Sequence, residues 1–222
     1  MAYTFSHLID TLSGTGDLTA VPNPFNDAYN KGSGGLDRRH VFNVSYVYAL
    51  PFAKHTSNMA ARTIIGGWGI SGITVFQTGL PLNVAYNGTD TLGLGGGTSN
   101  RPNLVGKISY PKTQKAWFNG ATAGVYTDPV APWFGGGNQG WGVARKDNVR
   151  GPGLNNFNLS LTKNIQLTGH EGPNVELRFE SFNTFNKTQF SGVNANNHDS
   201  NFGQVTSIYD SRKLELGGKF NF

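Results

Sequence analysis

The segment VELRFE (Val175–Glu180) carries the pattern that decides the fold of this chain. Apolar and charged side chains alternate at every position, so an extended chain has one apolar and one charged face. The segment KLELGGKFNF (Lys213–Phe222) largely repeats the pattern, and HVFNVSYVYAL (His40–Leu50) places Phe, Val, Tyr and Leu at alternate positions. A hydrophobic period of two predicts amphipathic β-strands rather than helices.

The same alternation, in places interrupted by glycine, predicts about six strands along the chain. They are Tyr3–Ile9, His40–Leu50, Ile64–Val84, Asn155–Lys163, Val175–Glu180 and Lys213–Phe222. Several reach ten or more residues, whereas ordinary strands have about five or six. About ten residues in a tilted strand are needed to cross a bilayer. We therefore expect an all-β fold, an antiparallel up-and-down meander that forms part of an outer-membrane β-barrel.

The connections between these strands alternate between long and short. They cover residues 10–37, 52–63, 85–153, 167–173 and 187–210. Outer-membrane barrels combine short periplasmic turns with long extracellular loops. This alternation favours a barrel wall, with 85–153 as its largest extracellular loop.

Composition narrows the class of protein further. The 222 residues include 31 glycines and 12% aromatic residues, and 14% are charged, whereas about 25% is usual. This composition does not fit a disordered tail or a coiled coil. No apolar run reaches the ~18 residues of a membrane-spanning helix. There is no cysteine, and the net charge of +5 is scattered, so no nucleic-acid partner is predicted.

Eight motifs in a fixed order resemble one family. They are DRRHVFNVSYVYALPF, GGWGISGITVFQTGLPLNV, RPNLVGK, AWFNGATAG, NVRGPGLNNFNLSLTKNIQL, LRFESFNTFNKTQF, FGQV and LELGGKFNF. Together they resemble the C-terminal end of TonB-dependent outer-membrane receptors of the Oar-like kind, which carry a carboxypeptidase-regulatory-like N-terminal domain. The resemblance covers nearly the whole chain.

The resemblance implies a large barrel with a plug in its lumen that takes up a ligand across the outer membrane of a Gram-negative cell. The implied partners are outer-membrane lipid, the rest of the barrel and its plug, a TonB-type energising protein that acts through the plug, and the barrel-assembly machinery. Residues 1–222 contain neither the plug nor the N-terminal domain. Since a closed barrel needs at least about eight strands, we expect these residues to be the C-terminal segment of a longer receptor.

Three groups of residues are candidates for function. Aromatic residues of the long loop would stack on a ligand or pack the loop: Trp117, Phe118, Tyr126, Trp133, Phe134 and Trp141. Charged residues of the last two strands would face the lumen, and either contact the plug or pair across the strands: Glu176, Arg178, Glu180, Lys213, Glu215 and Lys219. Phe220 and Phe222 resemble the signal that the assembly machinery reads.

Other residues give weaker hypotheses. Trp68, Tyr46 and Tyr48 fit an interfacial aromatic girdle. Arg145, Lys146 and Arg150 would favour an anionic ligand. His198-Asp199-Ser200 has the residue types of a hydrolase triad, but sequence neighbours alternate in direction along a strand, and triads are built from separate segments. We therefore predict no enzyme, no cofactor and no metal site.

Two alternatives belong to other functional classes. The first is a structural or adhesive surface module, in which the barrel is an anchor and the loops bind. The second is a soluble β-sandwich binding domain, which requires a core on one face of the sheet.

Overall fold

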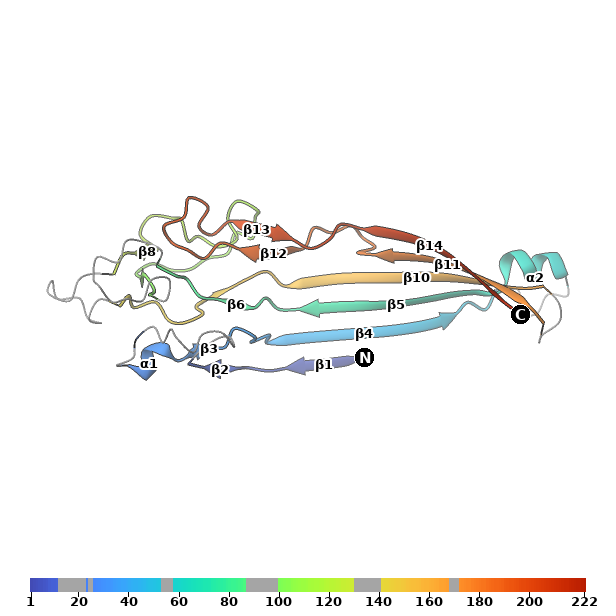
Figure 1. Cartoon of the computed structure of the whole chain (residues 1–222), viewed down its shortest axis with the longest axis horizontal. Coiled ribbons are helices and arrows are strands. Elements are labelled where there is room, and N and C mark those ends of the chain that lie inside the picture. The colour runs from blue at the N-terminus through green and yellow to red at the C-terminus, as the bar shows by residue number, and fades with distance from the viewer. Residues whose placement is uncertain (12–22, 24–25, 53–57, 87–99, 130–140, 168–171) are drawn as a thin grey trace.

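Six strands form one antiparallel sheet in the computed structural model, which describes residues 1–11, 23, 26–52, 58–86, 100–129, 141–167 and 172–222 (Figure 1). The order in the sheet is β1-β4-β5-β10-β11-β14, which is also their order along the chain. This confirms the predicted all-β meander. The sheet is not closed into a barrel.

The strands of this sheet are β1 (Ala2–Phe5), β4 (His40–Ala49), β5 (Trp68–Gln77), β10 (Leu154–Gln166), β11 (Asn174–Phe182) and β14 (Lys213–Asn221). The connections contain α1 (Asp27–Asn30), α2 (Met59–Ile65) and the short strands β2 (Ile9–Asp10), β3 (Gly32–Ser33), β6 (Pro81–Leu82), β7 (Asn103–Leu104), β8 (Tyr126–Thr127), β9 (Val149–Arg150), β12 (Phe190–Val193) and β13 (Val205–Ile208). Neither helix in the described part of the chain is long and apolar enough to cross a membrane.

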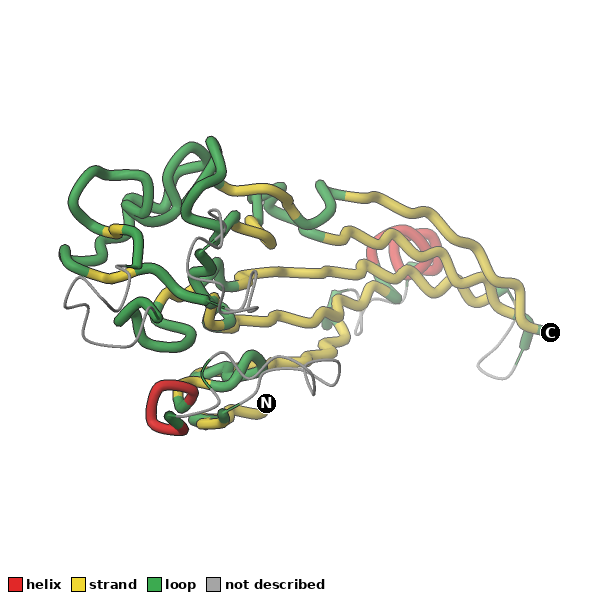
Figure 2. The backbone as a smooth tube through the Cα atoms, turned by 60° about the vertical axis from the view of Figure 1, so that its left-hand side comes forward, coloured by secondary structure: helices red, strands yellow, loops and turns green. Residues whose placement is uncertain are grey.

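The two ends of the sheet differ. At the loop end, where β5 finishes at Gln77, the connections fold into a layer that contains α1 and most of the short strands (Figures 1 and 2). At the turn end, where β5 begins at Trp68, Figure 1 shows α2 and the C-terminus. The long predicted connections therefore lie at one end of the sheet and the short ones at the other.

The register gives the sheet two chemically different faces. Directly opposed residues share a face, and Arg178 lies opposite Thr162 while Glu176 lies opposite Lys219. Extending this register gives a polar face on the last three strands: Asn156, Asn158, Ser160, Thr162, Asn164, Glu176, Arg178, Glu180, Lys213, Glu215 and Lys219. The other face is apolar and includes Val44, Tyr46, Ile70, Leu159, Leu161, Leu177, Phe179, Leu214, Leu216 and Phe220.

Aromatic rings mark both ends of the apolar face. At the loop end, the rings of Phe42, Phe76, Phe157 and Phe185 form a chain with centroid separations of 6.2, 5.5 and 5.0 Å. At the turn end, the face carries Trp68, with Tyr48 beside it on β4. Aromatic residues near both ends of an apolar strand face are typical of a membrane-spanning strand wall.

Neither face of the large sheet is covered by a second layer in the described residues. Leu216 on the apolar face is 85% exposed. The buried apolar cluster instead lies in the loop layer and consists of Val84, Phe118, Val149 and Phe202. The soluble β-sandwich is therefore wrong, because it requires a core between two sheets.

Two predicted strands were too long. Tyr3–Ile9 splits into β1 and β2, because the backbone N–H of Leu8 turns to donate to Asp37 Oδ1, at 3.0 Å. Ile64–Val84 begins as helix α2, whose N-cap Asn58 accepts the N–H of Ala61. The following Gly67 has φ +71° and lies so close to Asn164 O that a Cβ there would be 2.2 Å from it, which only glycine avoids.

An arginine introduced on the apolar face should destabilise the protein much more than an arginine introduced on the polar face. Leu159→Arg places a charge on the apolar face near the middle of β10, and we expect it to lower the free energy of unfolding from lipid vesicles by about 2–4 kcal/mol. Ser160→Arg is the matched control, because it lies on the polar face opposite Glu180. We expect it to change that free energy by less than about 1 kcal/mol. If both substitutions lowered the free energy of unfolding equally, the two faces of the sheet would not be in contact with different solvents.

Candidate functional site: the polar face and the loop layer

The charged ladder lies on one face, as the alternation predicted, but its ion pairs run along the strand. Arg178 lies 2.9 Å from Glu176 Oε1 and 3.8 Å from Glu180 Oε1, both on β11. In the described chain, no ion pair joins β11 to β14. The register places Glu176 opposite Lys219, as cross-strand pairing requires, but Arg178 faces Gly217 and Glu180 faces Glu215, a like charge.

At the loop end of this face, Lys213 pairs with Asp210 instead. The hydrogen bond and charge of Lys213 lower the pKa of the Asp210 carboxyl. Both groups are well exposed, so this pair is open to exchange with a ligand or with another part of the protein.

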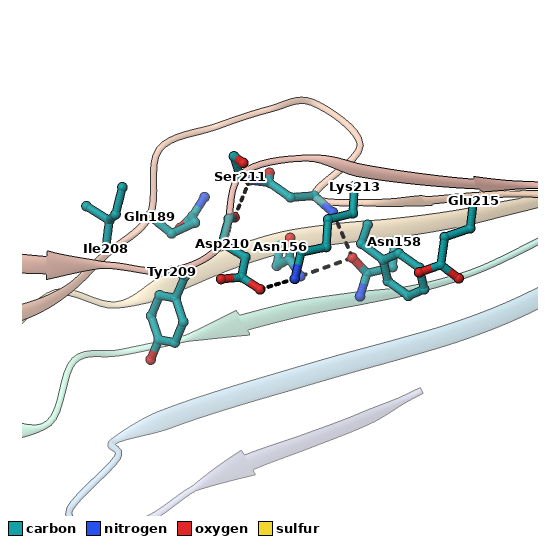
Figure 3. A pocket seen from close by; sticks show the side chains of 11 residues that line it. Asn156, Asn158, Gln189, Ile208, Tyr209, Asp210, Ser211, Lys213 and Glu215 are labelled. Atoms are coloured by element: carbon teal, nitrogen blue, oxygen red, sulfur yellow. Dashed lines mark hydrogen bonds and ion pairs between the residues drawn. The ribbon is translucent and has the colours of Figure 1, made fainter.

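A cavity of about 600 Å³ opens beside this pair, between the sheet and the segment 183–211 (Figure 3). Its lining combines amides, charges and a phenol ring, and includes Asn156, Asn158, Tyr209, Asp210, Lys213 and Glu215. Since Asn156, Asn158, Lys213 and Glu215 belong to the polar face by register, the cavity lies on that face.

A tight turn after β11 builds the far wall of the cavity. Asn183 and Asn186 adopt left-handed conformations with φ 51° and 49°, which asparagine tolerates better than most residues. The Asn183 amide donates to Lys187 O and Asp210 O and accepts the N–H of Lys187. Gln189 bonds both backbone groups of Asn155, so the segment is fixed to the start of β10.

The amides in the cavity leave one acceptor unused. Asn156 donates to Asn158 Oδ1, which also accepts the backbone N–H of Asn183. Asn156 Oδ1 is buried and has no hydrogen-bond partner among the described residues. Hydroxyl, amide or ammonium donors would satisfy it. The cavity is thus equipped for polar binding.

A buried carboxylate holds the loop layer together. Asp37 is fully buried and pairs with Arg150, whose Nη1 also donates to Asp37 O at 2.7 Å. His7 Nδ1 lies 3.2 Å from Asp37 Oδ2, and Leu8 N–H donates to Oδ1. Burial alone raises the pKa of Asp37, but the bonds from Arg150, Leu8 and His7 outweigh it and hold that pKa well below its usual range.

Two more cations are fixed in the same layer. Lys146 pairs with Asp10 and Asp147. Arg101 is buried, donates to Tyr29 O and lies 3.8 Å from the centre of the Tyr29 ring. Arg150 and Lys146 are therefore neutralised by carboxylates within the chain, which removes the basis for the predicted anionic ligand at these two residues.

The loop aromatics that the structure describes take part in packing. Phe118 is 1% exposed and meets Phe202 edge to face, and Trp141 is also buried, so neither offers a free ring to a ligand. Trp117 donates from Nε1 to Arg150 O. Burial raises the pKa of Tyr126 to about 12, and its OH accepts from Asn148. Phe118 and Trp141 thus pack the loop, which is the alternative role predicted for them from the sequence. Trp133 and Phe134 lie outside the described residues.

His198 bonds Asp128 at 2.8 Å and meets the Tyr86 ring edge to face. Asp199 instead accepts from Asn194 and Asn196. The described residues contain no group of three or more His, Asp or Glu side chains that could hold a metal ion.

Sequence reasoning missed the Asp37 network and the cavity. Asp37 and Arg150 lie next to predicted strands, but they are separated by 112 intervening residues, and alternation gives no information on which loops meet. The Asn-rich stretch after β11 was a usable signal, because asparagine favours left-handed turns.

One comparison with known proteins gives a result. The family model described as an outer membrane beta barrel domain matches residues 1–215. The chain belongs to this family. No curated protein and no solved structure matches.

Because the chain belongs to this family, the surroundings of the two faces of the sheet can be inferred. In barrels of this family type the apolar face of the wall meets lipid and the polar face meets the lumen, so we expect the charged ladder and the cavity on the luminal side. The chain is accordingly placed in the outer membrane.

Breaking the buried pair should loosen the loop layer. We expect Asp37→Asn to lower the free energy of unfolding by about 3 kcal/mol, the lower end for a broken buried pair, since the Arg150 side chain is 29% exposed. Chemical unfolding monitored by tryptophan fluorescence measures it. Asp27→Asn, at an exposed position on α1, is the control and should cost less than about 1 kcal/mol. Equal effects would show that the network does not stabilise the layer.

Because the pKa of Asp37 is lowered in the folded protein, the stability of the loop layer should depend on pH. A carboxyl with a depressed folded pKa stabilises the fold above its unfolded pKa of about 4, and this contribution is lost as the pH falls through the folded value. Pepsin should therefore cleave the loop layer slowly at about pH 4 and faster as the pH approaches about 2. Asp37→Asn should remove most of this difference. An unchanged pH profile in the variant would refute the assignment.

Proposed function

We propose that this chain forms wall and extracellular loops of a TonB-dependent outer-membrane receptor of the Oar-like kind, which takes up a ligand in a Gram-negative cell. The proposal rests on the ordered motifs, several of which build the features described above. NVRGPGLNNFNLSLTKNIQL supplies Arg150 and β10, and LRFESFNTFNKTQF supplies Arg178 and the turn at Asn183.

The observation that best supports a larger receptor is the open sheet with one charged face. Unpaired strand edges are not tolerated in lipid, so further strands must pair with the outer edges of β1 and β14. Barrels of about 16–18 strands keep an aqueous channel, whereas the barrels of outer-membrane transporters, with about 22 strands, have a plugged lumen, and uptake corresponds to the second kind. In this proposal residues 1–222 are the C-terminal segment of such a barrel, and Phe220 and Phe222 guide its assembly.

In the proposed mechanism the loop end is extracellular. A ligand that passes the loop layer reaches the luminal cavity, where Asn156, Tyr209 and Lys213 offer an acceptor, a phenol and an ammonium group. An energising protein that pulls on the plug would then open the path. The chain's own residues bind and position, and we propose no covalent chemistry.

A second candidate is an adhesive surface module. The loop layer favours it, because a buried core and the Asp37 network give these loops a defined surface that could bind a partner.

The coding sequence upstream of Met1, read in the same frame, separates the two candidates. Uptake predicts a plug, a contact box for the energising protein and further strands, and the complete gene product should capture the energising protein from detergent-solubilised envelopes. A barrel without a plug would refute uptake and leave adhesion.

The ladder gives a sharper prediction for uptake. In the complete gene product we expect a photocrosslinker at Arg178 to capture the receptor's own plug, because Arg178 is half-exposed on the luminal face. Arg178→Glu should reduce uptake with barrel assembly intact. A crosslinker at Leu177, the adjacent lipid-facing residue, is the control and should capture no plug. Normal uptake by Arg178→Glu would limit the ladder to a role in the wall.

A further inference from the structure

Helix α2 lies at the turn end of the sheet (Figure 1) and is bonded to side chains of its apolar face. Trp68 belongs to the apolar face by register, and its Nε1 donates to Ile64 O at 3.2 Å. Lys163 lies directly opposite Trp68 and donates to Ile64 O, at 3.2 Å, and to Gly66 O. The last turn of α2 is thus bonded to side chains that emerge on the lipid-facing side.

Lys163 would be costly on this face without the helix. It is 5% exposed and shares the face with Leu161 and Ile165. A cation on an apolar surface needs partners, and the unpaired carbonyl groups at a helix C-terminus provide both acceptors and a negative partial charge. The ammonium group also lies 5.1 Å from the centre of the Trp68 ring. Lys163 therefore joins the wall to α2.

The free side of α2 exposes apolar surface. Ile64 is 70% exposed, and Ile65 and Phe52 are each half-exposed. With about 100° between successive residues of a helix, Arg62 points nearly opposite to Ile64. Arg62 is exposed as well. The helix consequently exposes Ile64 on the side opposite to Arg62, whereas Ile65 lies about 60° from Arg62.

We propose that α2 is an interfacial anchor that lies in the membrane leaflet at the turn end, with Ile64 among the acyl chains and Arg62 toward the lipid phosphates. Trp68 and Lys163 connect α2 to the lipid-facing band, so the exposed side chain of Ile64 beside that band meets the same solvent. Interfacial helices bind in this way, with apolar residues inward and cations at the headgroups.

The anchor would set the depth of the wall. Strand β5 has ten residues from Trp68 to Gln77, which matches one bilayer crossing by a tilted strand. With α2 and Trp68 at one interface, the aromatic chain through Phe76 falls at the other. The inference depends on membership of the barrel family and not on transport, so a failed uptake experiment would leave it standing.

Spin labels can test the proposal, because residues 1–222 contain no cysteine and any cysteine elsewhere in the complete gene product is first replaced by serine. The complete gene product is labelled at Ile64→Cys and reconstituted in phosphatidylethanolamine–phosphatidylglycerol vesicles. Collision with oxygen is then compared with collision with a water-soluble nickel chelate. Arg62→Cys reports the headgroup side of the same helix, and Leu216→Cys reports the lipid-facing wall.

We expect the oxygen-to-nickel ratio at Ile64 to exceed that at Arg62 several-fold and to approach that at Leu216. A ratio at Ile64 equal to that at Arg62 would place the helix in water and overturn the proposal. A label shielded from both reagents would also overturn it, because protein would then cover the isoleucines.

A second variant tests the role of Lys163. Lys163→Met should free the last turn of α2 and lower the oxygen-to-nickel ratio of the Ile64 label toward that of Arg62. Lys219→Met removes a luminal cation and should leave the ratio unchanged. An unchanged ratio in Lys163→Met would show that Lys163 does not position the anchor. If Lys163→Met does not assemble, the comparison of Ile64 with Arg62 still decides the proposal.

Discussion

The structure depends on one constraint: the large sheet has no buried core of its own, so its strands must be held together by their backbone hydrogen bonds. Strands β4, β5, β10, β11 and β14 satisfy each other's backbone groups over nine to thirteen residues each, so the wall is held by its ladders. Its apolar face carries exposed side chains such as Leu216, which only lipid can cover favourably. The same constraint makes the open edges incompatible with a bilayer and requires further strands beside them.

The loop layer follows different physics. Its segments come from distant parts of the chain, and they meet around a small apolar cluster and a fully buried carboxylate. Asp37 draws Arg150, His7 and Leu8 together, and Phe118 packs with Phe202. Aqueous loops can use a buried core and buried ion pairs, whereas the wall beside lipid cannot. The chain therefore combines a lipid-dependent wall with a loop end that packs like a soluble protein.

Polar residues have different tasks on the two faces. On the luminal face, charges remain exposed and pair weakly, as Arg178 does along its own strand. On the lipid face a cation must be fully satisfied, and Lys163 is satisfied by carbonyl groups of Ile64 and Gly66 beside the Trp68 ring. This lysine thus fixes α2 to the wall, at the two residues, Ile64 and Ile65, that the sequence predicted as the start of a strand.

By itself the sequence determined the strand wall: its meander order, its two faces, the separation of long from short connections, and the shared face of Glu176, Arg178 and Glu180. These features are local, because a side-chain period of two fixes the face of each residue and chain order fixes the neighbours of a meander. Tertiary structure alone decided that Arg150 meets Asp37, that Phe118 is buried rather than free for a ligand, that Arg178 pairs within its strand, and that α2 covers Lys163. Each of these depends on which distant segments meet in space, and alternation within a segment carries no information about that.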